Sequence, residues 1–341
     1  MENPLALSLS IGSVIDRIRT SGIYLPKADF DYIKTQLFKH SSIKADFEFK
    51  GKVSPKCYKN KHGHFIYALH YETLDSHQPI ARFEIGSFIE PGKGETKKEN
   101  NLKYYLAWEL WPRRLINGEL RPFHQALDVL LKELDVWEHP PIYSYAHTYK
   151  FAKVKYLEIA IEFPNLEPHT FIPWRPRGRV SWIWTNPKTG EKGATYLGLK
   201  GDVHDGFAFY PKTKQLLETG QPPPKYFKDY PCTRFESRGY RTGFTLETLG
   251  KMKNQFIVLE IADPTKARGL SDAVPWREFL NRAMVDGSAK ALAGTTKGWQ
   301  RTKFIAMLRK AAHPGWNLKV KKQIWDSYLR SVERLSPEAM F

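Results

Sequence analysis

The sequence predicts an α+β fold, in which a mixed, mainly antiparallel β-sheet core is followed by a C-terminal helical module. Short segments rich in β-branched and aromatic residues follow one another from about residue 45 to residue 261. The run 185–190 between two of these segments is typical of a turn. Beyond about residue 268, the apolar residues instead recur at helical spacing.

The order of these elements divides the chain into three parts. A helical lead-in is expected over residues 1–44, with a helix opened by Pro26 and Asp29. An α+β core is expected over residues 45–267, and a basic helical module over residues 268–341. Strands of the core are expected at 65–69, 80–88, 104–108, 156–163, 180–184, 194–199, 206–210, 233–237 and 256–261, with an amphipathic helix at 121–137. Helices of the last part are expected near 276–292, 298–312 and 317–335.

A recurring motif suggests that the core is internally duplicated. An Arg-Phe-Glu triplet occurs at 82–84 and again at 234–236, each preceded by a strand that ends in Tyr, at Tyr67 and Tyr210. A further glutamate follows 24 or 25 residues after each triplet, at Glu109 and Glu260. The duplication predicts two similar β-rich halves, whereas chance recurrence of a short motif is the alternative.

The charge balance points to a polyanionic partner. The 341 residues include 53 Lys and Arg against 36 Asp and Glu, which gives a formal charge of +17. Such an excess increases self-repulsion, so it is typical of proteins that bind a polyanion. Ten Trp, 17 Tyr and 20 Phe supply rings that can stack on unpaired bases, although most can equally belong to the core. Charge and aromatic content together favour nucleic acid over a membrane surface. The candidate contacts in the core are Arg175, Arg177 and Arg179.

Other classes of protein are excluded by composition. Two cysteines exclude a disulfide framework and a cysteine-rich zinc site. The first residues lack the basic region of a secretion signal, and no window approaches the apolar length of a membrane span. We therefore expect a cytoplasmic protein without a membrane partner. No Gly-rich loop of the Walker type occurs, which argues against an intrinsic ATP-driven helicase.

A strand at 156–163 places two carboxylates on one face. Glu158 and Glu162 share that face because side chains alternate along a strand, and the opposite face is apolar. Two neighbouring carboxylates repel each other unless a cation lies near them, and oxygen ligands suit Mg²⁺ or Mn²⁺. The alternative is an exposed sheet face, paired with the nearby Lys153 and Lys155.

Tyr210 ends another expected strand and is followed by Pro211, Lys212 and Lys214. A phenol has a pKa of about 10, so attack on a phosphodiester requires nearby positive charge or a metal. Lys212 or Lys214 can supply that charge, and Pro211 would end the strand and leave the phenol accessible. The alternative is an ordinary buried tyrosine followed by a solvated basic turn.

The order of these motifs resembles that of rolling-circle replication initiators, above all the trans-acting plasmid initiators and the nicking endonucleases of filamentous phages. The resemblance covers roughly residues 100–265. Two departures are Glu158 in place of Asp, without the preceding Arg, and Pro211 in place of Asp. The motifs that carry the resemblance are Trp108-Glu109-Leu110-Trp111-Pro112, Tyr156-Leu157-Glu158, Tyr196-Leu197-Gly198, Tyr210-Pro211-Lys212 and Arg234-Phe235-Glu236.

The resemblance implies an endonuclease that starts plasmid or phage DNA replication. Tyr210 would attack single-stranded or hairpin origin DNA, leaving a 3′-hydroxyl and a 5′-phosphotyrosine, and the same covalent link would later allow rejoining. Mg²⁺ or Mn²⁺ would polarise the phosphate. The candidate ligands are Glu158, Glu162, Glu109 and Glu236. A host helicase and a second copy of the chain on the DNA stay open as partners.

Several further features leave alternatives open. His62 and His64 form either a metal-binding pair or part of a solvated turn, and Tyr67 is a rival nucleophile if the other half is active. Residues 266–341 contain 15 Lys and Arg against six Asp and Glu. Their short helices either bind duplex DNA in the helix-turn-helix manner or present a solvated face. The candidate contacts there are Arg301, Lys303, Arg309 and Lys310.

Two other functions fit the same sequence. One is a non-catalytic DNA- or RNA-binding accessory protein, which would bind in a salt-sensitive manner and be indifferent to Mn²⁺. The other is a metal-dependent nuclease that uses the carboxylates without a covalent tyrosine and leaves free ends.

Overall fold

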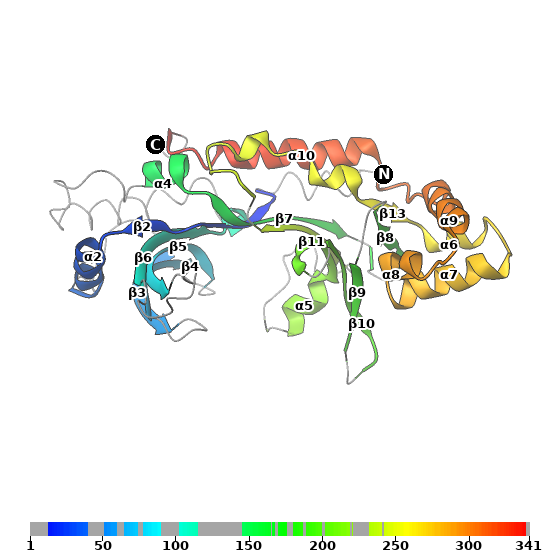
Figure 1. Ribbon diagram of the computed structural model, residues 1–341, viewed down its shortest axis with the longest axis horizontal. Coiled ribbons are helices and arrows are strands. Elements are labelled where there is room, and N and C mark those ends of the chain that lie inside the picture. The colour runs from blue at the N-terminus through cyan, green and yellow to red at the C-terminus, as the bar shows by residue number, and fades with distance from the viewer. Residues whose placement is uncertain are drawn as a thin grey trace, which may run out of the picture. The chain divides into compact units, whose positions relative to one another are not determined.

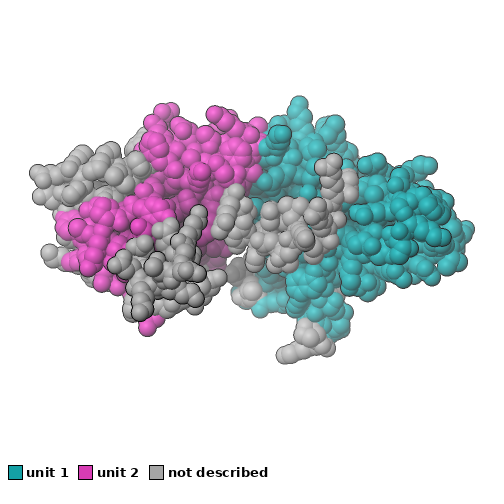
Figure 2. Space-filling view, viewed as in Figure 1, with its two compact units in different colours: residues 1–14, 158–240, 253–328 teal, residues 15–157, 241–252, 329–341 magenta. Residues whose placement is uncertain are grey.

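A computed structural model gives the fold of this protein. It describes residues 13–39, 51–59, 65–73, 78–89, 102–114, 145–164, 166–167, 170–175, 180–186, 189–199, 202–218, 220, 232–240 and 242–338. The chain forms two compact units (Figure 2). Unit 1 comprises residues 1–14, 158–240 and 253–328, and unit 2 comprises residues 15–157, 241–252 and 329–341. The units are therefore discontinuous in sequence and do not follow the divisions expected at residues 44 and 267.

Unit 2 contains an antiparallel sheet with the strand order β3-β4-β5-β6-β1, in which β2 also pairs with β6 (Figure 1). Strand β1 lies where a helical lead-in is expected, and the expected helix follows it as α2. The elements are β1 (Ile15–Thr20), β2 (Ile23–Leu25), α2 (Lys27–Lys39), β3 (Gly51–Lys59), β4 (Phe65–Thr73), β5 (Pro79–Ile89), β6 (Leu102–Leu110), a 3₁₀ turn η1 (Pro112–Arg114) and α4 (Tyr145–Phe151).

Alternation along these strands separates an apolar face from an ionic one. Phe83 and Trp108 are fully buried and pack edge-to-face with their ring centroids 5.4 Å apart. Their chain neighbours Glu84 and Glu109 point to the opposite face, as the two-residue period of a strand requires. Helix α2 packs on the sheet through Phe30, whose ring contacts Tyr104.

Unit 1 contains antiparallel strands in the order β7-β12-β11-β10-β9. The hairpin between β10 and β11 brings Gly198 opposite Gly206. A Cβ at Gly206 would lie 2.4 Å from the carbonyl oxygen of Leu197, and its φ is +156°, so the close approach requires glycine. The elements are β7 (Val154–Pro164, in unit 1 from residue 158), β9 (Val180–Thr185), β10 (Lys192–Leu199), β11 (Asp202–Pro211), α5 (Lys212–Glu218) and β12 (Cys232–Tyr240).

The helical part of unit 1 packs around a two-stranded sheet of β8 (Ile172–Trp174) and β13 (Glu260–Ala262). Trp276, Phe279 and Phe304 stack in its core. The helix expected over 276–292 is in fact two helices. Gly287, with a φ of +90°, separates them, and a Cβ there would lie 2.3 Å from the Ser181 hydroxyl. The helices are α6 (Pro264–Arg268), α7 (Val274–Val285), α8 (Ser288–Ala293), α9 (Gly298–Lys310) and α10 (Leu318–Glu333, in unit 1 to residue 328).

The fold confirms the α+β class with C-terminal helices, with local differences. The strand expected at 256–261 is a 3₁₀ turn η7 (Gln255–Val258) followed by the short β13, and a further 3₁₀ turn η6 covers Leu249–Lys251. The helix expected at 121–137 lies outside the described residues. Among the described helices, none has the length and apolar character needed to cross a membrane.

The two units share a strand plan, but not in the way that the recurring motif suggests. In each unit, a first strand is followed by an antiparallel meander of four strands, the last of which returns beside the first: β1 with β3–β6, and β7 with β9–β12. The two Arg-Phe-Glu triplets lie on β5 and β12, which occupy different places in this plan. Glu109 lies on β6, whereas Glu260 lies on β13 of the small sheet.

Candidate active site

The two carboxylates of β7 lie on a buried face. Glu158 is 8% exposed and Glu162 is 3% exposed, and Ile159 and Ile161 of the opposite face are buried as well. The shared face is therefore as predicted, and it is buried, not exposed as the alternative supposed. A buried carboxylate needs compensating charge or hydrogen bonds, because removing it from water is costly.

Tyr210 contributes a phenol to the same cluster. It lies near the end of β11, directly opposite Arg234 of β12, and its side chain is half-buried. Its hydroxyl donates a hydrogen bond to Oε1 of Glu236, which is 1% exposed. Tyr210 is thus neither a fully buried core residue nor a freely solvated phenol, and a buried carboxylate is in place to accept its proton.

Glu236 is the centre of a network of charges. The Arg238 Nε donates to Oε2 at 3.0 Å. The Arg234 Nε lies 3.2 Å from Oε1 of Glu236 and 3.5 Å from Oε1 of Glu162, so this guanidinium bridges the two carboxylates. Within unit 1, Arg234 and Arg238 therefore pair with two of the buried carboxylates, those of Glu162 and Glu236. Arg238 was not among the residues singled out from the sequence, although it stands on the same strand as the Arg-Phe-Glu triplet.

Two of the carboxylates can contribute ligands to a metal ion. Glu158 and Glu236 are both buried, and one carboxylate oxygen of each lies within 4.8 Å of the other. Oxygens bound to one Mg²⁺ at about 2.1 Å are separated by up to about 4.2 Å, so a small side-chain movement suffices. The donor set therefore fits a hard divalent cation. Glu162 instead faces Arg234.

The lysines that follow Tyr210 lie at the start of helix α5. Lys212 donates from Nζ to the side chain of Gln215 at 2.9 Å and lies 5.9 Å above the centre of the Tyr210 ring. Lys214 pairs with Glu191, a contact that lowers the pKa of the carboxyl and raises the pKa of the ammonium. The charged groups closest to the acceptor of the phenol proton are therefore Arg234 and Arg238.

A small pocket of about 180 Å³ opens beside Tyr210. Trp184, Tyr196, Lys214 and Arg238 are among the residues that line it. Trp182 stacks on Tyr196 with ring centroids 5.2 Å apart and is 48% exposed. Exposed rings beside cations are the chemistry that holds an unpaired base and its phosphate. These rings were not singled out from the sequence, although the alternation of Trp182 and Trp184 in β9 could have indicated an aromatic face.

The remaining proposed ligand and the rival nucleophile lie in unit 2. Glu109 accepts a hydrogen bond from the Arg17 Nε at 2.6 Å and also pairs with Arg82. Tyr67 packs against α2 and lies on the sheet face opposite Arg82, so it does not share the ionic face. The residue that stands opposite Arg82, as Tyr210 stands opposite Arg234, is His70.

The structure describes some of the residues proposed to contact DNA. Arg301, Lys303, Arg309 and Lys310 are all exposed on α9, and Arg175 is half-buried after β8. Arg177, Arg179, His62 and His64 lie outside the described residues.

Comparison with known proteins gives no family for this chain. A scan against protein-family models found no match, and a search of the curated proteins found no relative.

Proposed function

We propose that this protein is a DNA-nicking replication initiator of the rolling-circle type, in which Tyr210 is the nucleophile. The observation that carries the proposal is the hydrogen bond from the Tyr210 phenol to the buried Glu236 carboxylate, with Glu158 beside it. The aromatic and cationic pocket next to the phenol supports a nucleotide substrate. The exposed cations of α9 support further contact with DNA phosphates.

The reaction is a transesterification on phosphorus. The Tyr210 Oη forms a bond to the phosphorus while the bond from phosphorus to the 3′ oxygen breaks. The phenol proton passes to Glu236, and the departing 3′ oxygen takes up a proton to become a 3′-hydroxyl. The products are a 5′-phosphotyrosine and a primer end, and reversal of the same steps rejoins the strand. Arg234 and Arg238 neutralise charge around the acceptor.

A divalent cation, when bound, polarises the phosphate. Glu158 and Glu236 are the residues that would hold it, and we propose Mg²⁺ or Mn²⁺ because the donors are carboxylates. Glu236 then has two partners for two oxygens, the phenol on one and Arg238 on the other. Glu158→Gln removes one proposed ligand and leaves Glu236 in place as the proton acceptor, so the two roles can be tested separately.

The test is the formation of a covalent adduct. The protein is incubated with Mn²⁺ and a pool of single strands of randomised sequence, so that no origin sequence need be known. The adduct is isolated under denaturing conditions and the attached DNA is sequenced. We expect an adduct in the wild type and in Tyr196→Phe, which removes a hydroxyl from the same pocket. Tyr210→Phe should form none, and an undiminished adduct in that variant overturns the proposal.

A second candidate is a non-catalytic protein that binds single strands. It is favoured by the engagement of the Tyr210 hydroxyl with Glu236, since a buried hydrogen bond of this kind also serves stability alone. The same experiment separates the candidates. Binding without an adduct supports the accessory protein, and Mn²⁺-dependent cleavage to free ends supports a nuclease that uses the carboxylates alone.

A further inference from the structure

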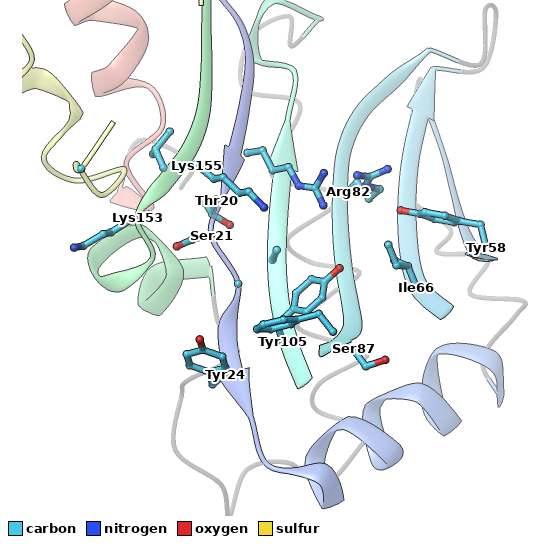
Figure 3. Close-up of a pocket in the computed structure, with 16 residues that line it drawn as sticks. Thr20, Ser21, Tyr24, Tyr58, Ile66, Arg82, Ser87, Tyr105, Lys153 and Lys155 are labelled. Carbon is cyan, nitrogen blue, oxygen red and sulfur yellow. The ribbon is translucent and has the colours of Figure 1, made fainter. Parts of the chain in front are cut away.

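Unit 2 contains a larger pocket, of about 960 Å³, on the ionic face of its sheet (Figure 3). In Figure 3, Lys153 and Lys155 flank one side, Tyr58 and Arg82 lie on the other, and Tyr105 lies between them. All the residues that line the pocket belong to unit 2. We call it the unit 2 pocket. Its size is at the upper end of the range for small-ligand sites.

The wall of the unit 2 pocket is cationic. Arg19, Arg82, Lys153 and Lys155 are among its described lining residues, and those residues include no Asp or Glu. The carboxylates lie beneath the wall, where they fix the two guanidinium groups. The Arg19 Nη2 lies 2.5 Å from Oε1 of Glu84, and the Arg82 Nη2 lies 3.0 Å from Oε2 of the same residue. Lys153 and Lys155 are both exposed. Such a wall suits an anion.

The floor of the pocket is aromatic and pre-formed. A Cβ at Gly22 would lie 2.6 Å from Tyr105, and a Cβ at Gly86 would lie 2.7 Å from it, so the two glycines make room for the ring. Burial, followed by the charge of Glu84, raises the pKa of Tyr105 to about 12, so the phenol stays protonated at neutral pH.

The mouth of the pocket has an exposed ring. Tyr24 is 60% exposed and stacks with Phe88, the ring centroids lying 6.1 Å apart. Exposure of a large aromatic beside cations leaves apolar surface in water unless a ligand covers it. A nucleotide offers a flat base to stack on the ring and a phosphate to pair with the lysines. The base must be unpaired to stack on the ring while its phosphate contacts the lysines.

We propose that the unit 2 pocket binds a short run of a single-stranded nucleic acid without cleaving it. The bases stack against Tyr24, Phe88 and Tyr105, and Lys153, Lys155 and Arg19 neutralise the phosphates. This inference goes beyond nicking by Tyr210 and does not depend on it, because the residues concerned are different and no covalent step is involved.

The first test measures salt dependence. Full-length Tyr210→Phe protein, without divalent cation, is titrated with a fluorescein-labelled thymidine single strand, and anisotropy is followed from low to moderate salt. Removing one lysine–phosphate interaction lowers the slope of log affinity against log salt by about 0.7 for single strands. Lys153→Gln/Lys155→Gln should therefore lower the slope by about 1.4, if both contact phosphates. Lys27→Gln/Lys150→Gln makes the same charge change on exposed residues outside the pocket and should leave the slope unchanged.

The second test concerns the rings. Tyr24→Ala should weaken binding about tenfold, the loss typical of one stacked base. Phe151→Ala removes a ring that is 65% exposed and outside the pocket, and should have no effect. Photocrosslinking with iodouridine strands should modify peptides that contain Tyr24, Phe88 or Tyr105.

Four results would overturn the inference. Pocket variants that bind as their controls do would exclude the pocket as the binding site, as would crosslinks confined to unit 1. If thymidine monophosphate competes at a concentration near the dissociation constant of the strand, the unit 2 pocket is a mononucleotide site. Equal competition by duplex DNA would remove the preference for unpaired bases. An absent Tyr210 adduct has no bearing on any of these measurements.

Discussion

Unit 1 and unit 2 each have a buried glutamate at the end of an Arg-Phe-Glu triplet. Glu84 accepts a hydrogen bond from the Tyr58 hydroxyl at 3.3 Å, and Glu236 accepts one from the Tyr210 hydroxyl. In both triplets the arginine also contacts the glutamate, Arg82 in one and Arg234 in the other. The two triplets therefore share the same local contacts: in each, a buried glutamate pairs with the arginine of its own triplet and accepts a hydrogen bond from a tyrosine.

The surroundings differ in their charge. Around Glu84, the described cluster contains three arginines and one further carboxylate, Glu109. Around Glu236, the residues of unit 1 include two arginines and two further carboxylates, Glu158 and Glu162. A surplus of cations suits an anion, and a surplus of carboxylates suits a metal cation. The two clusters therefore share the triplet and differ in the balance of the charges around it, and we expect this balance to decide what each can bind.

The largest difference between the two clusters is expected when each central glutamate is substituted. Glu236→Gln removes the proposed proton acceptor and should reduce adduct formation by about 1,000-fold, within the range for general base catalysis. Glu84→Gln makes the same change in unit 2 and should keep the adduct rate within about twofold, since it touches neither Tyr210 nor its acceptor. Single-turnover gels measure both rates. Equal losses in the two variants would contradict the distinction between the clusters.

A smaller effect is expected at His70, which stands opposite Arg82. Burial, followed by the charges of Lys56 and Arg82, lowers the pKa of His70 to about 4. The unfolded chain takes up this proton near pH 6.5, whereas the native state takes it up only near pH 4. Stability is therefore full above pH 6.5 and is lost as the pH falls toward 4.

His70→Gln removes this linkage. We expect the loss of unfolding free energy between pH 7 and pH 4.5 to be smaller by about 2 kcal/mol in the variant. Urea titrations at the two pH values measure it. An unchanged pH dependence in His70→Gln would show that the imidazole is not responsible.

The smallest effect concerns the metal. A cation that binds only the native state at ten times its dissociation constant stabilises the fold by about 1.4 kcal/mol. Mn²⁺ should therefore raise the midpoint of thermal unfolding in the wild type, and Glu158→Gln should abolish the rise. Glu109→Gln provides the control in unit 2, where the carboxylate is held by Arg17 and Arg82. A rise that persists in Glu158→Gln would place the ion elsewhere.

Features that depend on local periodicity could be predicted from the sequence. The alternation of 157–163 placed Glu158 and Glu162 on one face, and the helical spacing near the C-terminal end indicated α9 and α10 correctly. The split at Gly287 was missed, because the close contact with Ser181 joins residues more than 100 positions apart.

The contacts of the site depend on strand register, which the sequence does not reveal. Tyr210 and Glu236 are 26 residues apart and meet because β11 pairs with β12 so that Tyr210 faces Arg234. Lys212 and Lys214 adjoin Tyr210 in sequence, but the chain turns into α5 and directs their amines to Gln215 and Glu191. Proximity along the chain therefore did not indicate these partners of the lysines, and it overlooked Arg238.

The discontinuity of the two units has a consequence for synthesis of the chain. The boundaries fall after residues 14, 157, 240, 252 and 328, so the chain passes between units five times. Unit 1 needs residues up to 328, and unit 2 draws on residues up to 341. Neither unit can therefore reach its full set of long-range contacts while the ribosome is still translating the middle of the message. Folding is expected to be late and joint, and a fragment cut at any single position removes part of at least one unit.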